Sequence, residues 1–315
     1  MIVVCGEALF DVFIEGEVDA GGAGYALSSH VGGSPFNLAI GLARLGARPM
    51  FFGGLSVDRF GCKLAGTLTH EGVNLDAAPR LAASTALVIV DVNGAGVPTY
   101  TLYGAQTADR MVTPAELAHV PVDAAVIHVG SYCMAVEPVA STQRALVERQ
   151  QGRSLIAFDP NVRLTIQPDR KVWIDAVAWM LPRTDLLKIS DEDIALLYPD
   201  LTPQGFIDIA LRAGVALVVV TRGGDGVLAA TPTVGAVSLP AMAVNVVDTV
   251  GAGDTFQAAL LSWLARHQLL TRAALGALDA PALQAALQFA ARAAAITCSR
   301  RGADLPRLKE VGAHA

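Results

Sequence analysis

Short apolar runs alternate with longer helical patterns along most of this chain of 315 residues. Runs of about five apolar residues bounded by polar residues or glycine are typical of strands buried on both faces of a sheet. Their alternation with helices predicts an α/β fold with a central, mostly parallel, doubly wound sheet and helices on both faces. The predicted strands include IVVCG, PMFFGGLS, AAVIHVG, SLIAFDP, DLLKIS and VALVVVTRGG. We expect helices over 34–46, 60–72, 137–151, 169–180, 191–198, 203–213, 252–266 and 280–296.

Two segments break this alternation. Residues 9–31 and 83–104 resemble β-hairpins, and the second contains an Asn-Gly turn signal. Such inserts form a small accessory sheet, which can act as a lid if it lies beyond the carboxyl ends of the main strands. The alternative is an edge addition with no role in gating. Since no repeat or linker divides the chain, we expect one domain over 1–315, with a lid from about 11–31 and 83–104.

Charge and hydropathy exclude several classes of protein. The net charge is −6, and the sequence has no basic block of the kind that binds along a nucleic-acid backbone. We therefore expect no nucleic-acid partner. No uninterrupted apolar stretch reaches the ~20 residues of a membrane span, and the N-terminal stretch lacks the basic segment of a signal peptide. The four cysteines, at positions 5, 62, 133 and 298, form no C-x-x-C pair. We therefore expect a cytoplasmic protein with reduced thiols.

The stretch DTVGAGDTF is the strongest candidate for chemistry. Gly251 and Gly253 precede an apolar helical run, and free N–H groups at a helix start bind anions. Asp254 falls in the first turn, where it could take the proton of an alcohol that attacks a phosphoryl group. The alternative is that Asp248 or Asp254 only caps the helix. The chain has no P-loop, G-x-G-x-x-G, H-E-x-x-H or G-x-S-x-G motif.

Polar residues at a helix start and at a strand end suggest a polyol site. Gly32 and Gly33 come directly before a helix that contains Asn37 in its first turns, so backbone and amide could both reach hydroxyl groups. Asp11, which we expect at the end of the first buried strand, could accept hydrogen bonds from vicinal hydroxyls. Each signal is also compatible with an ordinary turn, helix start or solvated strand end.

Three further strands are followed by polar residues or glycine. In α/β folds the carboxyl ends of strands are disproportionately functional, although turns there have a similar composition. These residues are Asp159, Asn161 and Arg163 after one strand, Lys188, Ser190 and Asp193 after the next, and Thr221, Gly223, Gly224 and Gly226 after the third.

Taken in order, these motifs resemble the ribokinase-like (PfkB) family of carbohydrate kinases. The resemblance covers nearly the whole chain, through GEALFD, GGSPFNLAIGLARLG, FDPNVR, LKISDED, VTRGGDG, DTVGAGDTF and AAAITCSRRGA. It implies ATP-dependent phosphorylation of a sugar hydroxyl, with Mg²⁺ at the phosphates. It also implies a monovalent cation such as K⁺ beside the anion site, and a homodimer formed through the lid.

The resemblance implies a role for each motif. Asp254 would be the catalytic base, and the amides of Gly251, Ala252 and Gly253 would form the anion hole. Asp248 would adjoin the monovalent cation and Asp193 would organise water around Mg²⁺. The sugar would be held by Asp11, Gly32, Gly33, Asn37, Tyr103, Asn161 and Arg163. The nucleotide would be held by Lys188, Ser190, Thr221, Gly223, Gly224, Gly226, Gly253 and Ala291.

The chain departs from the family pattern in two places. The N-x-x-E pair that often organises water around Mg²⁺ matches Ser190 and Asp193 here, with Glu192 as an adjacent alternative. An asparagine often found near the adenine in the last long helix matches Ala291. Both departures weaken the corresponding assignments.

The motifs are most similar to those of fructokinases, in which the acceptor is the 6-hydroxyl of D-fructose. The alternative within the class is a 2-keto-3-deoxygluconate kinase, in which Arg163, Tyr100 and Tyr103 would meet the substrate carboxylate. A nucleoside kinase would need an apolar slot, for which Phe10, Phe36 and Tyr103 are candidates. The alternative from another class is a non-catalytic sugar-binding homologue.

Overall fold

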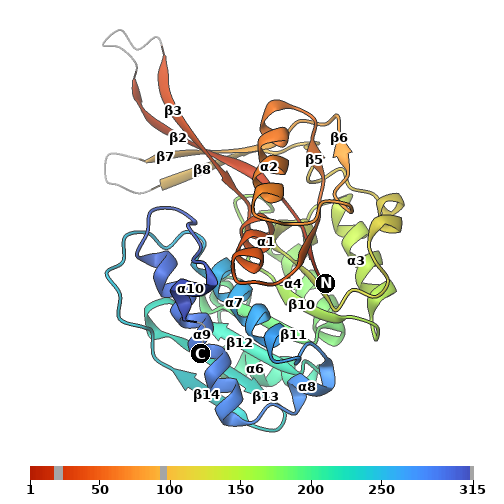
Figure 1. The fold of residues 1–315 in the computed structure, drawn as a ribbon, viewed down its shortest axis with the longest axis vertical. Coiled ribbons are helices and arrows are strands. Elements are labelled where there is room, and N and C mark those ends of the chain that lie inside the picture. Colours follow the sequence, from red (N-terminus) through yellow and green to blue (C-terminus); the bar gives the residue numbers. More distant parts are fainter. Residues whose placement is uncertain (18–23, 93–97, 313–315) are drawn as a thin grey trace.

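A large sheet forms the centre of the molecule (Figure 1). The computed structural model describes residues 1–17, 24–92 and 98–312. Eight strands follow the order β14-β13-β12-β11-β10-β9-β1-β4. Their bounds are β1 (Ile2–Cys5), β4 (Pro49–Phe52), β9 (Val126–Gly130), β10 (Leu155–Asp159), β11 (Leu186–Ser190), β12 (Leu217–Thr221), β13 (Val227–Thr231) and β14 (Gly235–Leu239). The six neighbouring strands β4, β1, β9, β10, β11 and β12 pair in parallel. β13 and β14 add an antiparallel edge that we did not predict.

Helices cover both faces of this sheet. Successive residues of a strand point to opposite sides, so the apolar residues of each buried strand require cover on both faces. In β10, Leu155 and Ala157 belong to one core cluster, whereas Ile156 and Phe158 belong to the other. The first cluster packs under α1 (Ser34–Arg44), α2 (Arg59–His70), α7 (Ala252–Arg266) and α9 (Ala280–Cys298). The second packs under α3 (Val139–Gln150), α4 (Arg170–Met180), α5 (Asp191–Leu197) and α6 (Pro203–Arg212). The predicted mostly parallel, doubly wound fold is therefore confirmed.

Two shorter helices complete this set: α8 (Arg272–Gly276) and α10 (Leu308–Val311). Each predicted long helix has an observed counterpart whose ends differ by at most a few residues. Side-chain caps set several of these starts; for example, Asp58 accepts a hydrogen bond from the Gly61 amide at the start of α2. Among the described residues, no helix is long and apolar enough to cross a membrane.

A second, four-stranded sheet projects from the large one, at the upper left of Figure 1. Its order is β3 (Tyr25–Gly32), β2 (Leu9–Glu17), β7 (Ala86–Val92) and β8 (Pro98–Tyr103). β2 and β3 are antiparallel, as are β7 and β8, while β2 and β7 pair in parallel. The predicted small sheet is thus present. The expected Asn-Gly turn lies outside the described residues.

The first strand ends earlier than we expected. β1 stops at Cys5, and Gly6 takes a φ of 145°, so the chain turns before β2 begins at Leu9. Asp11 is therefore the third residue of β2 in the small sheet, and the expectation that it ends the first buried strand was wrong. A further two-stranded sheet pairs β5 (Leu55–Ser56) with β6 (Arg80–Leu81).

Candidate active site

The start of α7 is built by its glycines. Gly251 is the N-cap residue with φ 76° and ψ 1°, a left-handed conformation that favours glycine. A Cβ atom there would lie 2.7 Å from the Cβ atom of Ala303. No side chain caps α7, so neither Asp248 nor Asp254 has the capping role that we considered as an alternative.

The first N–H groups of α7 are suited to an anion. Such groups have no acceptor within their own helix and lie at the positive end of the helix dipole. Ala252 N–H donates to the Thr249 carbonyl at 3.2 Å, while the Gly253 N–H makes no hydrogen bond within the described part of the chain. A Cβ atom on Gly253 would lie 3.1 Å from Lys188 Nζ, so this lysine places a positive charge beside the helix start.

Asp254 is held by two side chains from α1, the helix that packs against α7. Ser34 Oγ donates to Asp254 Oδ1 at 2.6 Å, and Asn37 Nδ2 donates to Asp254 Oδ2 at 2.9 Å. Burial raises the pKa of Asp254 above its ordinary value, although both hydrogen bonds and the charge of Lys188 act to lower it. The result is an oriented carboxylate whose affinity for a proton is increased, as a general base requires.

A buried ion pair lies beneath this helix start. Lys188 Nζ is 2.8 Å from Asp159 Oδ2, and the two side chains are 6% and 4% exposed. Although burial alone would lower the pKa of Lys188, the charge and hydrogen bond of Asp159 raise it, so the lysine is cationic. The strands β10 and β11 are neighbours in the sheet, which explains why residues 29 positions apart meet.

Ser190 and Asp193 both have local structural contacts. Ser190 caps α5 by accepting a hydrogen bond from the Asp193 amide at 3.0 Å. Asp193 Oδ1 in turn accepts a hydrogen bond from the Val162 amide at 3.0 Å, which ties α5 to the loop after β10. Burial raises the pKa of Asp193, and Arg163 opposes this effect. Asn161, in the same loop, has a φ of 42°.

Asp11 lies against the glycine pair before α1. A Cβ atom on Gly32 would be 2.4 Å from Asp11 Oδ2, so only glycine leaves room for this carboxylate. Gly33 has a φ of 107°, and a Cβ atom there would be 2.8 Å from the Glu7 carbonyl oxygen. Burial raises the pKa of Asp11 to about 6, while the charges of His30 and Arg163 act to lower it. The structure thus groups Asp11 with the glycine pair, within the influence of the Arg163 charge.

Five of the residues predicted to hold the nucleotide lie at the end of β12, in the turn after it and in α9. Thr221 ends β12 opposite Ser190, and the glycines that follow form a tight turn. A Cβ atom would meet nothing within 4 Å at Gly223 or Gly224, but at Gly226 it would lie 2.1 Å from the Leu239 carbonyl oxygen. Gly226 therefore serves the turn, whereas the other two leave open backbone. Ala291 lies in α9, half-buried beside the first core cluster.

Asp248 braces the loop before α7. Its Oδ1 atom accepts a hydrogen bond from the Val250 amide at 3.0 Å, and its Oδ2 atom accepts one from the Gly302 amide at 2.8 Å. In the part of the chain that the structure describes, no group of three or more His, Cys, Asp or Glu side chains could hold a metal ion.

The aromatic residues considered for a nucleobase slot or for a substrate carboxylate lie in two different parts of the structure. Phe10 and Phe36 are 4% and 0% exposed within the core, so neither offers a face to a nucleobase. Tyr100 and Tyr103 lie on β8 of the small sheet and are 52% and 64% exposed. Neither tyrosine makes a side-chain hydrogen bond to another described residue, and neither stacks on the Arg163 guanidinium.

Sequence reasoning missed Ser34 as a site residue and the pairing of Asp159 with Lys188. Ser34 lies three positions before Asn37, so both occupy one face of the helix, and this spacing was the available signal. The ion pair had a weaker signal, since Asp159 and Lys188 are each near the carboxyl end of a strand predicted to be parallel.

The fold and the site together define a ribokinase-like α/β protein with free N–H groups and a half-buried, oriented carboxylate at one helix start. The model of the family described as pfkB family carbohydrate kinase matches residues 1–310. The chain belongs to this family of carbohydrate kinases, as the motifs implied.

Both a curated relative and solved structures support membership in this family. The chain is 35% identical to a fructokinase of Rhizobium leguminosarum bv. trifolii over 287 residues, which cover 90% of this chain and 86% of the relative. Its fold is similar to that of Xylella fastidiosa fructokinase with bound ATP, with a TM-score of 0.87, 28% identity and coverage of 98% and 96% of the two chains. It is also similar to Vibrio cholerae O395 fructokinase bound to fructose, ADP and calcium ion, with a TM-score of 0.82, 26% identity and coverage of 99% and 97%.

Proposed function

We propose that this protein is a fructokinase that transfers the γ-phosphoryl group of ATP to the 6-hydroxyl of D-fructose. The observation that carries this proposal is Asp254, a half-buried carboxylate oriented by Ser34 and Asn37 at the start of α7, where free N–H groups suit an anion. The substrate assignment is supported by the fructokinase relatives and by the solved relative that contains fructose and ADP. We further propose that residues 1–315 work as one kinase domain with the small sheet as its lid.

In the proposed mechanism, Asp254 accepts the proton of the sugar hydroxyl. The hydroxyl oxygen forms a bond to the γ-phosphorus while the bond between that phosphorus and ADP breaks. The Gly251 and Gly253 amides and the α7 dipole stabilise negative charge on the transferring group. The Ala252 amide joins them if its long bond to Thr249 opens. Lys188 adds a positive charge beside Gly253. Closure of the lid would exclude water from this step.

Sugar binding is assigned to the group around Asp11. This carboxylate would accept hydrogen bonds from vicinal hydroxyls, and the glycine pair would let the backbone approach the sugar. Because Asp11 would repel an acid sugar, its position beside the glycines favours fructose over 2-keto-3-deoxygluconate. We assign secondary sugar contacts to Asn161, Arg163 and Tyr103, with Asn37 bridging between sugar and base.

Nucleotide binding is assigned to the turn after β12, where Gly223 and Gly224 leave the backbone open. Mg²⁺ would neutralise charge on the phosphates. Asp193 fits a role through water, because only its Oδ1 atom is occupied by the Val162 amide. Asp248 fits a position beside K⁺ less directly, since both its oxygens accept backbone N–H groups. Ala291 offers the adenine only a small apolar surface.

The exposed apolar residues of the small sheet support a homodimer formed through the lid. Tyr25, Leu27, Tyr100 and Tyr103 are 65%, 59%, 52% and 64% exposed on its strands. Large exposed apolar groups gathered on one element often mark an interface. We also propose a cytoplasmic location, where free thiols persist, because all four cysteines are unpaired.

A kinase assay across acceptors tests the proposed function. ADP release is measured with fructose, 2-keto-3-deoxygluconate, ribose, adenosine and aminoimidazole riboside at fixed ATP and Mg²⁺. We expect the highest kcat/KM with fructose. A clear preference for another acceptor would overturn the substrate assignment and leave the mechanism standing. Sugar binding without turnover of any acceptor would support the non-catalytic alternative.

A further inference from the structure

The loop after α9 packs against the loop before α7. The Cys298 carbonyl oxygen accepts hydrogen bonds from the amides of Val247 and Asp248, at 2.8 and 3.2 Å. The Gly302 amide donates to Asp248 at 2.8 Å, and Ala303 fills the space beside the missing Cβ of Gly251. Residues 298–303 therefore fix the backbone of 247–251, the segment that leads into the anion site.

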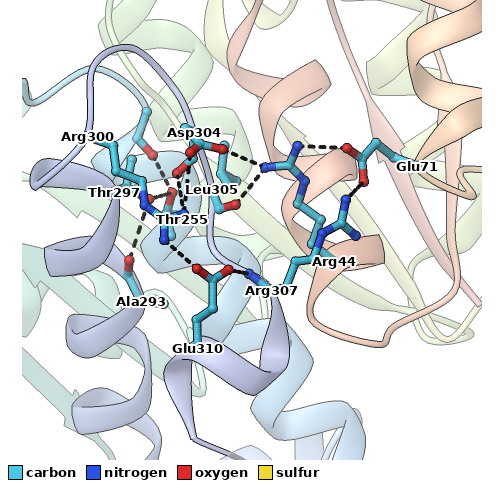
Figure 2. Close-up of polar contacts among 11 residues, drawn as sticks. Arg44, Glu71, Thr255, Ala293, Thr297, Arg300, Asp304, Leu305, Arg307 and Glu310 are labelled. Atoms are coloured by element: carbon cyan, nitrogen blue, oxygen red, sulfur yellow. Dashed lines mark hydrogen bonds and ion pairs between the residues drawn. The ribbon is translucent and has the colours of Figure 1, made fainter.

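Arg44, the last residue of α1, anchors this loop. Figure 2 shows its guanidinium between Glu71 on one side and Asp304 with Leu305 on the other. Arg44 Nη1 donates to the Leu305 carbonyl oxygen at 2.6 Å and to Asp304 Oδ1 at 3.0 Å. The Leu305 side chain is 2% exposed and occupies the space that a Cβ atom on Gly41 would need. The loop is thus held on α1 by both a polar and an apolar contact.

The second amino group of the Arg44 guanidinium, Nη2, pairs with Glu71. Nη2 lies 2.7 Å from Glu71 Oε1, just after the end of α2, and Glu71 Oε2 lies 3.1 Å from Arg307. The side chains of Arg44 and Glu71 are 19% and 8% exposed, so water screens this pair less than it screens a surface pair. The hydrogen bond from Arg44 lowers the pKa of Glu71, which stays charged at neutral pH. A planar guanidinium can hold these acceptors together, whereas an ammonium cannot.

Arg300 joins the same network from within the loop. Its guanidinium lies 3.4 Å from Asp304 Oδ2 and also pairs with Glu310. The loop is therefore connected to α10 as well as to α1 (Figure 2).

α1 serves the site at both of its ends. Its first turns carry Ser34 and Asn37, which orient Asp254. Its last residue, Arg44, is ten residues beyond Ser34, or about 15 Å along the helix axis, so it does not reach the reacting atoms. Arg44 therefore acts on the site from a distance, and its contacts with Asp304 and Leu305 connect it to the loop beside the start of α7.

We propose that Arg44 is a positioning residue for phosphoryl transfer, holding residues 298–305 so that the start of α7 keeps the geometry that stabilises the transition state. This inference rests on the proposed function. It predicts a defect that is larger in the transition state than in the ground state, because most of the proposed contacts to sugar and nucleotide come from elements other than the start of α7.

The test compares Arg44→Met with wild type and with Lys171→Met, which breaks an exposed ion pair of 2.6 Å on α4. For each protein we would measure kcat, the Kd of fructose, the Kd of ADP, and the Kd of ADP with aluminium fluoride in the presence of fructose, a mimic of the transferring phosphoryl group. We expect Arg44→Met to lower kcat about 10-fold to 100-fold and to weaken the mimic by a similar factor. The fructose and ADP constants should change less than about 2-fold, and Lys171→Met should behave as wild type.

Two further variants keep the test decisive if Arg44→Met does not fold. Asp304→Asn, at a partly exposed position, should give a smaller defect of the same kind, and Arg44→Lys should lie between wild type and Arg44→Met. Unchanged kcat in these variants, or equal losses for fructose, ADP and the mimic, would overturn the positioning role. A wild-type protein inactive with every acceptor would instead overturn the proposed function.

Discussion

Asn37 Nδ2 donates to Asp254 Oδ2 at 2.9 Å and so joins two motifs that are 217 residues apart in the chain. This hydrogen bond orients the carboxylate from the helix that also begins beside the Asp11 group. Helix α1 therefore links the proposed base on α7 to the proposed sugar site beside its own start. A geometry set by packed helices is held more tightly than one set by loops.

Removing the Ser34 hydroxyl should shift the pH dependence of catalysis. In Ser34→Ala, Asp254 loses a hydrogen bond that lowers its pKa, so this pKa rises. Because the base acts only when ionised, activity should disappear at a higher pH as the solution is acidified. We expect the acidic limb of the kcat profile to move to higher pH. Ser262→Ala, which removes a buried hydroxyl on α7 that donates to the Leu45 carbonyl rather than to Asp254, is the control; equal profiles for the two variants would contradict this prediction.

Replacing Lys188 by Met should damage both stability and activity. The substitution leaves the Asp159 carboxylate buried without its cation, which costs about 3–5 kcal/mol in free energy of unfolding. It also removes the positive charge beside Gly253. Urea denaturation and steady-state kinetics measure the two effects.

A double variant separates these roles of Lys188. Replacing Asp159 by Leu as well removes the unpaired charge, so Lys188→Met/Asp159→Leu should recover most of the lost stability. It should not recover kcat if the lysine charge takes part in phosphoryl transfer. Wild-type kcat in the double variant would remove Lys188 from the mechanism.

Fructose binding should weaken in acid. Burial raises the pKa of Asp11 to about 6, so the carboxylate becomes protonated as the pH falls through this value and accepts hydrogen bonds less well. The Kd of fructose, measured by calorimetry between pH 5 and 8, should rise on the acidic side. Asp11→Asn should bind more weakly and show a nearly flat profile. If the variant kept the wild-type inflection, another group would be responsible for it.

The sequence was most informative where one local pattern determined the structure. The glycines before an apolar run predicted the start of α7 at Ala252, and alternation of strands and helices predicted the sheet. The antiparallel edge strands β13 and β14 escaped prediction, because each has only five residues and no helical pattern separates them from β12 or from each other. Asp11 was misplaced because the turn at Gly6 depends on a backbone angle that no periodicity reveals.

Contacts between distant segments could not be predicted. Nothing in the sequence places Ser34 against Asp254, because that contact requires α1 to pack on α7. Arg44 resembles any charged residue at a helix end, and its role depends on a loop more than 250 residues further along the chain. Single charged residues carry no periodic signal, and their partners follow only from the finished fold.

The central claim is that Asp254 is the general base, and the rate of Asp254→Asn tests it most directly. The asparagine keeps the size of the side chain but cannot accept the proton of the sugar hydroxyl. With fructose and MgATP at saturation, we predict that kcat falls about 10²-fold to 10⁴-fold while the Kd of fructose stays close to that of the wild type. A variant that retained most of the wild-type kcat would contradict the mechanism.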